Sequence, residues 1–273
     1  MDTARCTRSR SRRMRRTLVG VVSAAVAACF AFPAQQAAAI VGGYEATPHS
    51  MPYTLELHLQ GAAGTTLCGA VIIAPEWALT TARCIPASGV LEATAGAHGL
   101  NTTGTHIGVA QTIVHPKYNQ ETFDSDIALL RLAERLDFTN PATRPIELVE
   151  DDNDDPIDGV IEVAGWGAQS FGGSKSESLY AVEEAIVPRS SCRKSYGVSA
   201  ITDTMICGGP TSNAGGTGFC AGDQGGPGVT NDPVRLVGLA SWRAPKTCAS
   251  AEHPDVFTSI GAFRYWIKRN TGM

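Results

Sequence analysis

The sequence predicts an all-β fold, an antiparallel barrel or sandwich completed by one C-terminal helix. Three observations predict this fold class. From residue 40 onward, short runs rich in β-branched and apolar residues recur, Gly and Pro interrupt them, and helical spacing of apolar residues is found only near the end. The 273 residues, 43% hydrophobic and 18% charged, suffice for one large domain or two small ones.

Six runs carry the strand pattern. They cover residues 71–73, 78–81, 107–114, 127–132, 160–164 and 236–242. The predicted helix contains Ile260, Phe263, Trp266 and Ile267 at helical spacing, and basic residues follow where cations favour the helix dipole. The acidic segment 150–155 lacks the spaced ligands and glycine of a calcium loop, so we expect a surface loop between two halves.

Residues 1–39 have the order of an export signal. Seven basic residues lie within the first 16 positions, an apolar stretch covers 18–32, and three alanines occupy 37–39. The apolar stretch is too short to cross a membrane as a helix, so we expect cleavage after Ala39 and a secreted, extracellular domain. Twin-arginine export through Arg12 and Arg13, and lipidation at Cys29, are the alternatives.

The charge of the remaining 234 residues excludes one class of partner. The full chain has a formal net charge of −4, but without the leader 15 basic and 25 acidic residues remain, a net charge of −10. A surface this acidic repels phosphate backbones, so we expect no nucleic-acid binding. No membrane association is expected once the leader is removed.

Six of the eight cysteines follow the leader. They are Cys68, Cys84, Cys192, Cys207, Cys220 and Cys248. An even number in an exported chain indicates disulfides, whereas a zinc site would need close pairs of cysteines, which are absent. Six cysteines allow 15 pairings, and the sequence count leaves them open.

Four stretches, in their order along the chain, resemble the chymotrypsin and trypsin family of serine proteases. They are Ile-Val-Gly-Gly at 40–43, Thr-Ala-Arg-Cys at 81–84, Asp-Ser-Asp-Ile-Ala-Leu-Leu at 124–130, and Gly-Asp-Gln-Gly-Gly-Pro at 222–227. The resemblance implies two antiparallel six-stranded β-barrels, an N-terminal one at about 40–140 and a C-terminal one with the helix at about 150–273. It places an active site in the cleft between them, and implies the disulfides Cys68–Cys84, Cys192–Cys207 and Cys220–Cys248.

The catalytic chemistry of this family needs a serine nucleophile, a histidine base and a buried aspartate that orients the histidine. The resemblance assigns the aspartate position to Asp126, but the histidine position holds Arg83 and the serine position holds Gln224. A guanidinium has no acceptor lone pair, and a carboxamide is no usable nucleophile. The six histidines of the chain all lie outside the motif, so the sequence predicts a degenerate triad without catalysis.

We expect Arg83 to have a structural role. If Asp126 is buried as the resemblance implies, the guanidinium is expected to pair with that carboxylate and to donate to the carbonyl of Gln224. Replacement of Arg83 by Ala would then strand a buried charge at a cost of about 3 to 5 kcal/mol.

The family's specificity pocket maps onto a second group of residues, Gly218, Phe219, Ser241, Trp242, Arg243 and Asp255. Gly218 and Phe219 are expected at its base and wall, Arg243 at its rim, and Asp255 on the facing wall. Either Arg243 bridges to Asp255 and closes the mouth, or Arg243 points to solvent and Asp255 accepts a basic side chain from a ligand.

Two further features of the family are intact in the sequence. Ile40 stands where a freed N-terminal amine pairs with an aspartate, and Asp223 stands at that aspartate. The backbone amides of Gly222 and Gln224 are expected to form a donor pair, the oxyanion hole. Cleavage after Ala39 would create the Ile40 amine directly.

The predicted function is that of a secreted, monomeric trypsin-fold protein that acts by binding a protein or peptide, as a decoy, inhibitor or scaffold. The alternatives are an active secreted endopeptidase or esterase with a non-standard catalytic arrangement, and an exported protein without a dedicated ligand. We expect no cofactor and no metal, because residues 96–108, where the family has a calcium loop, contain no carboxylate.

Overall fold

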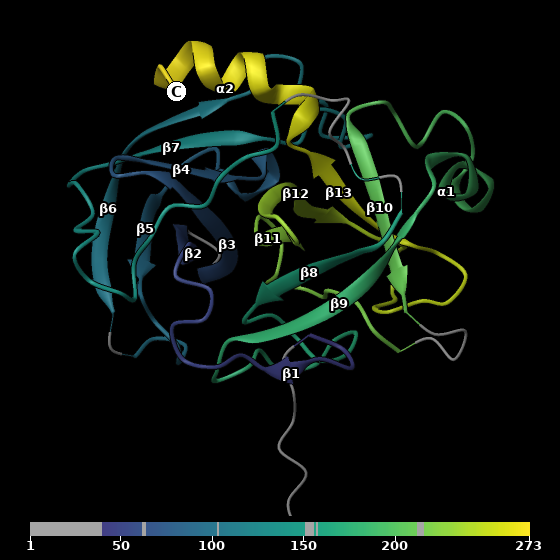
Figure 1. The fold of residues 1–273 in the computed structure, drawn as a ribbon, viewed down its shortest axis with the longest axis horizontal. Helices are drawn as coiled ribbons and strands as arrows, with labels where there is room; N and C mark the ends of the chain where they lie inside the picture. The colour runs from purple at the N-terminus through teal and green to yellow at the C-terminus, as the bar shows by residue number, and fades with distance from the viewer. Residues whose placement is uncertain (1–39, 62–63, 103, 151–155, 157, 212–215) are drawn as a thin grey trace, which may run out of the picture. The chain divides into compact units, whose positions relative to one another are not determined.

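Alternating apolar residues build two closed antiparallel β-barrels of six strands each, which lie side by side in Figure 1. The structure is a computed structural model that describes residues 40–61, 64–102, 104–150, 156, 158–211 and 216–273. The predicted export signal and most of the predicted acidic loop, residues 151–155, lie outside the described residues.

The first barrel contains six strands in the order β2-β3-β4-β7-β6-β5. Their bounds are β2 Thr54–Gly61, β3 Gly64–Ala74, β4 Trp77–Thr80, β5 Val90–Ala95, β6 Thr105–Val114 and β7 Ala128–Leu132. A short 3-10 turn, η1 (Ala82–Cys84), follows β4 and carries Arg83.

The second barrel closes because β8 pairs with both β9 and β11. Its strands are β8 Val160–Gly165, β9 Tyr180–Val187, β10 Met205–Pro210, β11 Pro227–Asn231, β12 Val234–Trp242 and β13 Asp255–Ser259. A two-residue strand, β1 (Tyr44–Glu45), adds to β9 outside the ring. The prediction of two six-stranded barrels is therefore confirmed.

All six runs predicted as strands lie within strands or within one residue of a strand end, in β3, β4, β6, β7, β8 and β12. The helix predicted near the C-terminus is also present, as a 3-10 turn η3 (Gly261–Phe263) followed by α2 (Arg264–Thr271). The remaining strands were not identified individually, and neither was the eight-residue helix α1 (Arg189–Tyr196), which buries only Cys192 and has no apolar face to reveal it.

Alternation along β7 explains how the barrels pack. Leu130 and Leu132 lie in the apolar cluster inside the first barrel. Leu129 faces the opposite way and joins a second cluster, which also contains Val163 and Leu239 of the second barrel. The outer face of the first barrel is thus the surface against which the second barrel packs.

In Figure 1 the C-terminal helix α2 lies above β7, on the side of the first barrel. Ile267 is fully buried, and Phe263 and Trp266 contact the His115 ring with centroids 4.8 and 5.1 Å away. His115 therefore has a packing role. Within the described residues, no helix has the length and apolarity needed to span a membrane.

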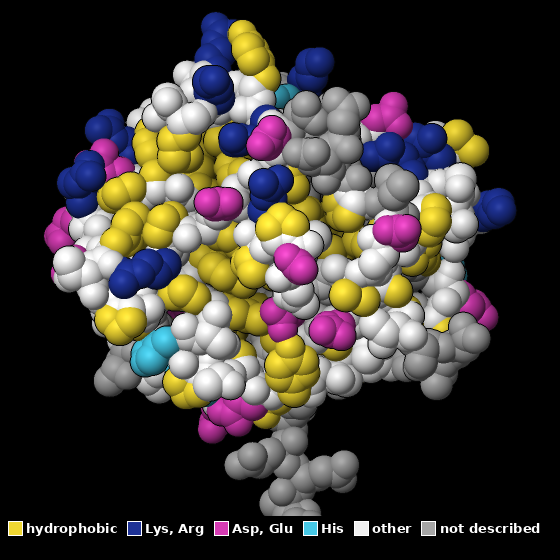
Figure 2. Space-filling model, in the orientation of Figure 1, with side chains coloured by type: hydrophobic (Ala, Val, Ile, Leu, Met, Phe, Trp, Pro, Cys, Tyr) yellow, Lys and Arg dark blue, Asp and Glu magenta, His cyan; other side chains and the backbone are white. Residues whose placement is uncertain are grey.

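Three disulfides are present, with the pairing that the family resemblance implied. Cys68 of β3 bonds to Cys84 at the end of η1, Cys192 of α1 bonds to Cys207 of β10, and Cys220 bonds to Cys248. Figure 2 shows acidic and basic side chains interspersed on one face of the molecule.

Candidate active site

Asp126 is fully buried just before β7, where the two barrels meet. Its Oδ1 accepts a hydrogen bond from the backbone N–H of Arg83 at 2.8 Å, and its Oδ2 accepts one from the Ser241 hydroxyl at 2.6 Å. Burial raises the pKa of Asp126, and these two hydrogen bonds oppose the rise. Each carboxylate oxygen therefore has a donor without any contribution from a charged side chain.

The side chain of Arg83 turns away from Asp126. Its guanidinium donates to the carbonyl of Ser241 at 2.9 Å, and the guanidinium carbon lies 4.4 Å from the centre of the Phe123 ring. The side chain is exposed, and no ion pair joins it to Asp126 within the part of the chain that the structure describes. The predicted ion pair is wrong, because the Ser241 hydroxyl and a backbone N–H already satisfy the carboxylate.

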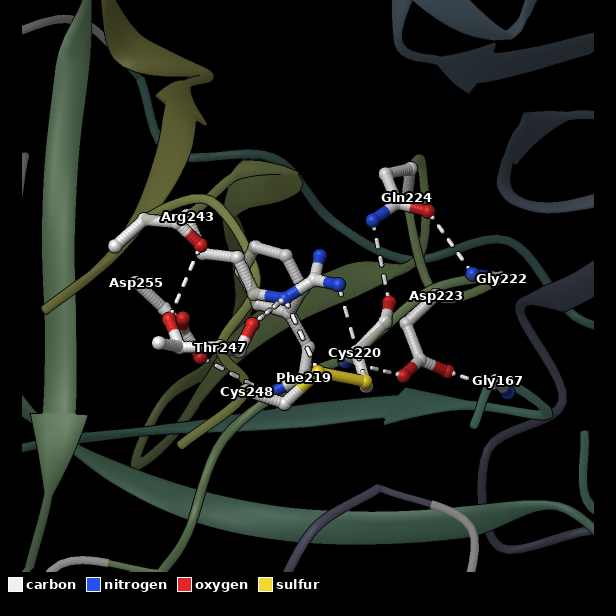
Figure 3. Close-up of a disulfide and its surroundings, with 11 residues drawn as sticks. Gly167, Phe219, Cys220, Gly222, Asp223, Gln224, Arg243, Thr247, Cys248 and Asp255 are labelled. Carbon is white, nitrogen blue, oxygen red and sulfur yellow. Dashed lines mark hydrogen bonds between the residues drawn. A yellow bond between two sulfur atoms is a disulfide. The ribbon is translucent and has the colours of Figure 1, made fainter. Parts of the chain in front are cut away.

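Gln224 folds back onto its own loop. Its side-chain carbonyl Oε1 accepts the backbone N–H of Gly222 at 3.0 Å, and its Nε2 donates to the carbonyl of Cys220 at 3.2 Å, as Figure 3 shows. The predicted hydrogen bond from Arg83 to Gln224 is absent, since this amide oxygen bonds to Gly222. One of the two amides expected to form the oxyanion hole is therefore engaged by the chain itself.

Asp223 points into the second barrel, away from Gln224 (Figure 3). It is fully buried and accepts hydrogen bonds from the backbone N–H groups of Gly167 at 2.7 Å and Cys220 at 2.8 Å. Burial raises its pKa to about 6. A side chain at Gly165 or Gly167 would collide with this carboxylate, since a Cβ there would lie 2.1 or 2.5 Å from it, so both positions require glycine.

The first residues after the leader dock into the second barrel. Ile40 is fully buried, and Val41 exchanges two backbone hydrogen bonds with Gly218, at 3.1 and 3.2 Å. Pairing of an Ile40 amine with Asp223 stays a prediction about the cleaved chain.

The predicted pocket residues do lie together. A Cβ at Gly218 would lie 2.4 Å from Oδ2 of Asp255, and the same oxygen accepts the Phe219 N–H at 3.0 Å. Phe219 is fully buried and meets Phe257 edge-on at 5.3 Å between ring centroids. Trp242 lies beside Tyr196 at 4.9 Å. Glycine at position 218 thus makes room for the carboxylate of Asp255.

Arg243 neither bridges to Asp255 nor extends into solvent. Its Nε donates to the carbonyl of Thr247 at 2.7 Å, and its guanidinium lies over the Phe219 ring, 6.0 Å from its centre, beside the Cys220–Cys248 disulfide (Figure 3). No ion pair to Asp255 is found among the described residues. The expected closure by an ion pair is wrong, because backbone and ring contacts hold the guanidinium instead.

Glu184 of β9 is a site residue that the sequence analysis missed. It is fully buried, and its carboxylate lies over Gly208, where a Cβ would be 2.5 Å from Oε2. Neither of its oxygens, nor Oδ1 of Asp255, has a hydrogen-bond partner among the described residues. Burial and the charge of the neighbouring Asp255 both raise the pKa of Glu184, so the two carboxyls titrate as a coupled pair. Alternation along β9, which buries Tyr180, Val182 and Glu184 on one face, was the signal that could have found it.

Burial sets the protonation of this pair. It raises the pKa of Glu184 well above its ordinary value, and the neighbouring Asp255 raises it further. Burial also raises the pKa of Asp255, to about 8, although Arg243 and the Phe219 N–H oppose the rise. Both shifts favour the protonated form of the carboxyls.

A hollow of ≈ 310 Å³ lies beside Gln224, and Arg83 and Lys175 contribute to its wall. None of the six histidines lines it or contacts Asp126. Among the described residues, no three His, Cys, Asp or Glu side chains are grouped to hold a metal ion.

Comparisons with known proteins agree with this architecture. The family model described as Trypsin matches residues 40–267. Trypsin Blo t 3 of Blomia tropicalis is 35% identical, with 84% of this chain and 85% of that protein covered. Brachyurin of Leptuca pugilator is 33% identical, with 86% and 99% covered, and a trypsin of Phaedon cochleariae is 32% identical, with 85% and 88% covered. The chain therefore belongs to the trypsin family of serine proteases.

Proposed function

We propose that this protein is secreted and binds a protein or peptide in its interbarrel cleft without cleaving it. The observation that carries the proposal is the Gln224 side chain, which stands at the nucleophile position and is hydrogen-bonded at both ends to its own loop. A trypsin-family protein with this arrangement retains the surface that contacts a substrate and loses the reaction.

Proton transfer is blocked at the base position. A general base must accept a proton near neutral pH, whereas the guanidinium of Arg83 remains charged and has no lone pair to offer. The buried carboxylate of Asp126 contacts Arg83 only through the backbone N–H, so it orients no catalytic side chain.

Stabilisation of an oxyanion is blocked as well. An incoming carbonyl needs the N–H of Gly222, which already donates to Oε1 of Gln224 at 3.0 Å. A substrate would have to displace this internal acceptor and would then find no nucleophile. Both chemical steps of acyl transfer therefore lack a participant.

We further propose that cleavage after Ala39 frees the Ile40 amine and that this amine pairs with Asp223. Asp223 is buried with two backbone donors and no cationic partner among the described residues, so an ammonium group nearby would neutralise it. N-terminal sequencing of secreted protein is the test. A start other than Ile40, or a lipid on Cys29, would overturn this part of the proposal.

The function itself is tested with a fluorophosphonate probe and an ester substrate. We expect neither labelling nor turnover by the unaltered mature domain. The double variant Arg83→His with Gln224→Ser should regain both, while each single variant stays inactive, because base and nucleophile act as a unit.

The second candidate is a hydrolase with a non-standard catalytic arrangement. The names of the similar proteins, which are trypsins and a brachyurin, favour it. Stoichiometric labelling or turnover by the unaltered protein would establish this candidate and refute the binding proposal.

A further inference from the structure

The hollow beside Gln224 is built from both barrels, so a bound group there would contact both sides of the cleft. Its volume is ≈ 310 Å³. The residues that line it are Thr66, Leu67, Cys68, Arg83, Cys84, Ala168, Gly173, Lys175, Ala221, Gly222 and Gln224. None of the predicted specificity-pocket residues, such as Phe219 and Asp255, lines this hollow.

The charges in this wall have one sign. Arg83 and Lys175 are its only charged residues, and no carboxylate lines it. Within the described residues, the guanidinium of Arg83 makes one hydrogen bond, to the carbonyl of Ser241, which leaves other N–H groups free. The ammonium of Lys175 has no hydrogen-bond or ion-pair partner among the same residues, and partial burial lowers its pKa. Two cations without a counter-ion favour an anionic ligand.

An exposed aromatic side chain lies in the same turn as Lys175. Ala168 and Lys175 pair with each other as an isolated β-bridge, and the N–H of Gly173 donates to Ser170, so the segment between them is a closed turn. Phe171 lies in that turn and is 58% exposed. Exposed aromatic residues beside a charged contact are typical of protein-binding surfaces.

We propose that this hollow binds an acidic side chain, Asp or Glu, presented by a loop of a partner protein, with Phe171 packing on the apolar residues beside it. The inference rests on the proposed binding function and names the chemistry of the partner. A guanidinium and an ammonium suit one carboxylate, which Arg83 can bind with two parallel hydrogen bonds. The net charge of −10 without the leader opposes a polyanion, so a nucleic acid is excluded as the ligand.

Selection from a peptide phage library tests the proposal. The peptides are fused to the coat protein through their C-termini, so that only side chains supply carboxylates. Selection on the mature domain should enrich Asp or Glu at one position, and a double variant with Arg83→Gln and Lys175→Gln should lose the enrichment. The matched control Lys117→Gln, which changes an exposed lysine outside the hollow, should keep it.

An amidated synthetic peptide from the selection then gives affinities. We expect at least a tenfold weaker Kd for the double variant, an equal loss when the peptide's acidic residue becomes its amide, and near-normal binding by the charge-conserving Lys175→Arg variant. Circular dichroism and a thermal midpoint show whether each variant is folded.

The outcomes separate the two proposals. Peptides without an acidic residue, equal affinity for the double variant, or no enriched peptide would each overturn the carboxylate site. Peptides that bind the unaltered domain and the double variant with the same low Kd would refute the carboxylate site and still support the general binding function. Ester turnover by the unaltered domain would refute that function whatever the hollow binds.

Discussion

Two buried aspartates of the cleft differ in how they are neutralised. Asp126 has a donor on each oxygen, from the Arg83 backbone and the Ser241 hydroxyl. Asp255 has a backbone donor on one oxygen and lies against a second buried carboxyl, Glu184. Asp126 is thus held by neutral hydrogen bonds, which explains why Arg83 makes no ion pair with it. Asp255 instead has a carboxyl neighbour, and burial raises the pKa of both groups.

The largest effect should follow Ser241→Ala. The change leaves one oxygen of the buried Asp126 without its donor, and we expect a loss of about 2 to 3 kcal/mol in the free energy of unfolding, measured by chemical denaturation. In an Asp126→Asn background, Ser241→Ala should lower the free energy of unfolding far less, because the group that loses its donor is then neutral. Equal costs in both backgrounds would mean that Ser241 acts through packing.

Glu184→Gln should change how stability depends on pH. Both carboxyls have folded-state pKa values above their ordinary ones, to about 8 for Asp255, so the folded protein keeps a proton that the unfolded chain releases. The stability that these raised pKa values contribute is fully present below about pH 4, the ordinary pKa of the carboxyls, and is lost as pH rises through about 8.

Thermal unfolding from pH 5 to pH 9 should show stability falling as pH rises in the unaltered protein, and a flatter profile in Glu184→Gln. Glu183→Gln, a change at the exposed neighbour on the same strand, is the matched control and should leave the profile steep. A flat profile in the unaltered protein would contradict the raised pKa values of this carboxyl pair.

Gln224→Ala should have a smaller effect on stability, about 1 kcal/mol, since it removes two neutral hydrogen bonds in a partly exposed loop. Its sharper consequence is local. The Gly222 N–H loses its acceptor, so its hydrogen exchange should accelerate, whereas the Gly167 N–H, held by Asp223, should not change. Unchanged exchange at Gly222 would mean that this amide is not held by Gln224.

Arg83→Ala should have the smallest effect, below about 1 kcal/mol, because it removes an exposed guanidinium that packs on Phe123 and leaves the backbone bond to Asp126 in place. A free energy of unfolding lowered by about 3 kcal/mol would instead support the ion pair that the sequence suggested. Arg83→Lys, which keeps the charge, would then recover part of that loss.

The sequence predicted what depends on periodicity and on ordered motifs. Alternation in runs such as 127–132 identified strands, and the family motifs led to the barrels and to the disulfide pairing. Contacts that depend on side-chain direction were not predictable. The sequence motifs predicted that Arg83 lies next to Asp126. The residue type alone did not show that the backbone N–H of Arg83, and not its guanidinium, makes the hydrogen bond. Glu184 was missed because its partner, Asp255, is 71 positions away in sequence.

Two of the disulfides in the described part of the chain fasten the loops that carry Arg83 and Gln224. Cys84 directly follows Arg83, and Cys220 precedes Gln224 in the same loop. Because these cross-links restrict the loops before any partner arrives, binding should sacrifice little conformational entropy there. Surface side chains of these restrained loops can then be substituted, and the binding preference changed, while the backbone conformation of the cleft is kept.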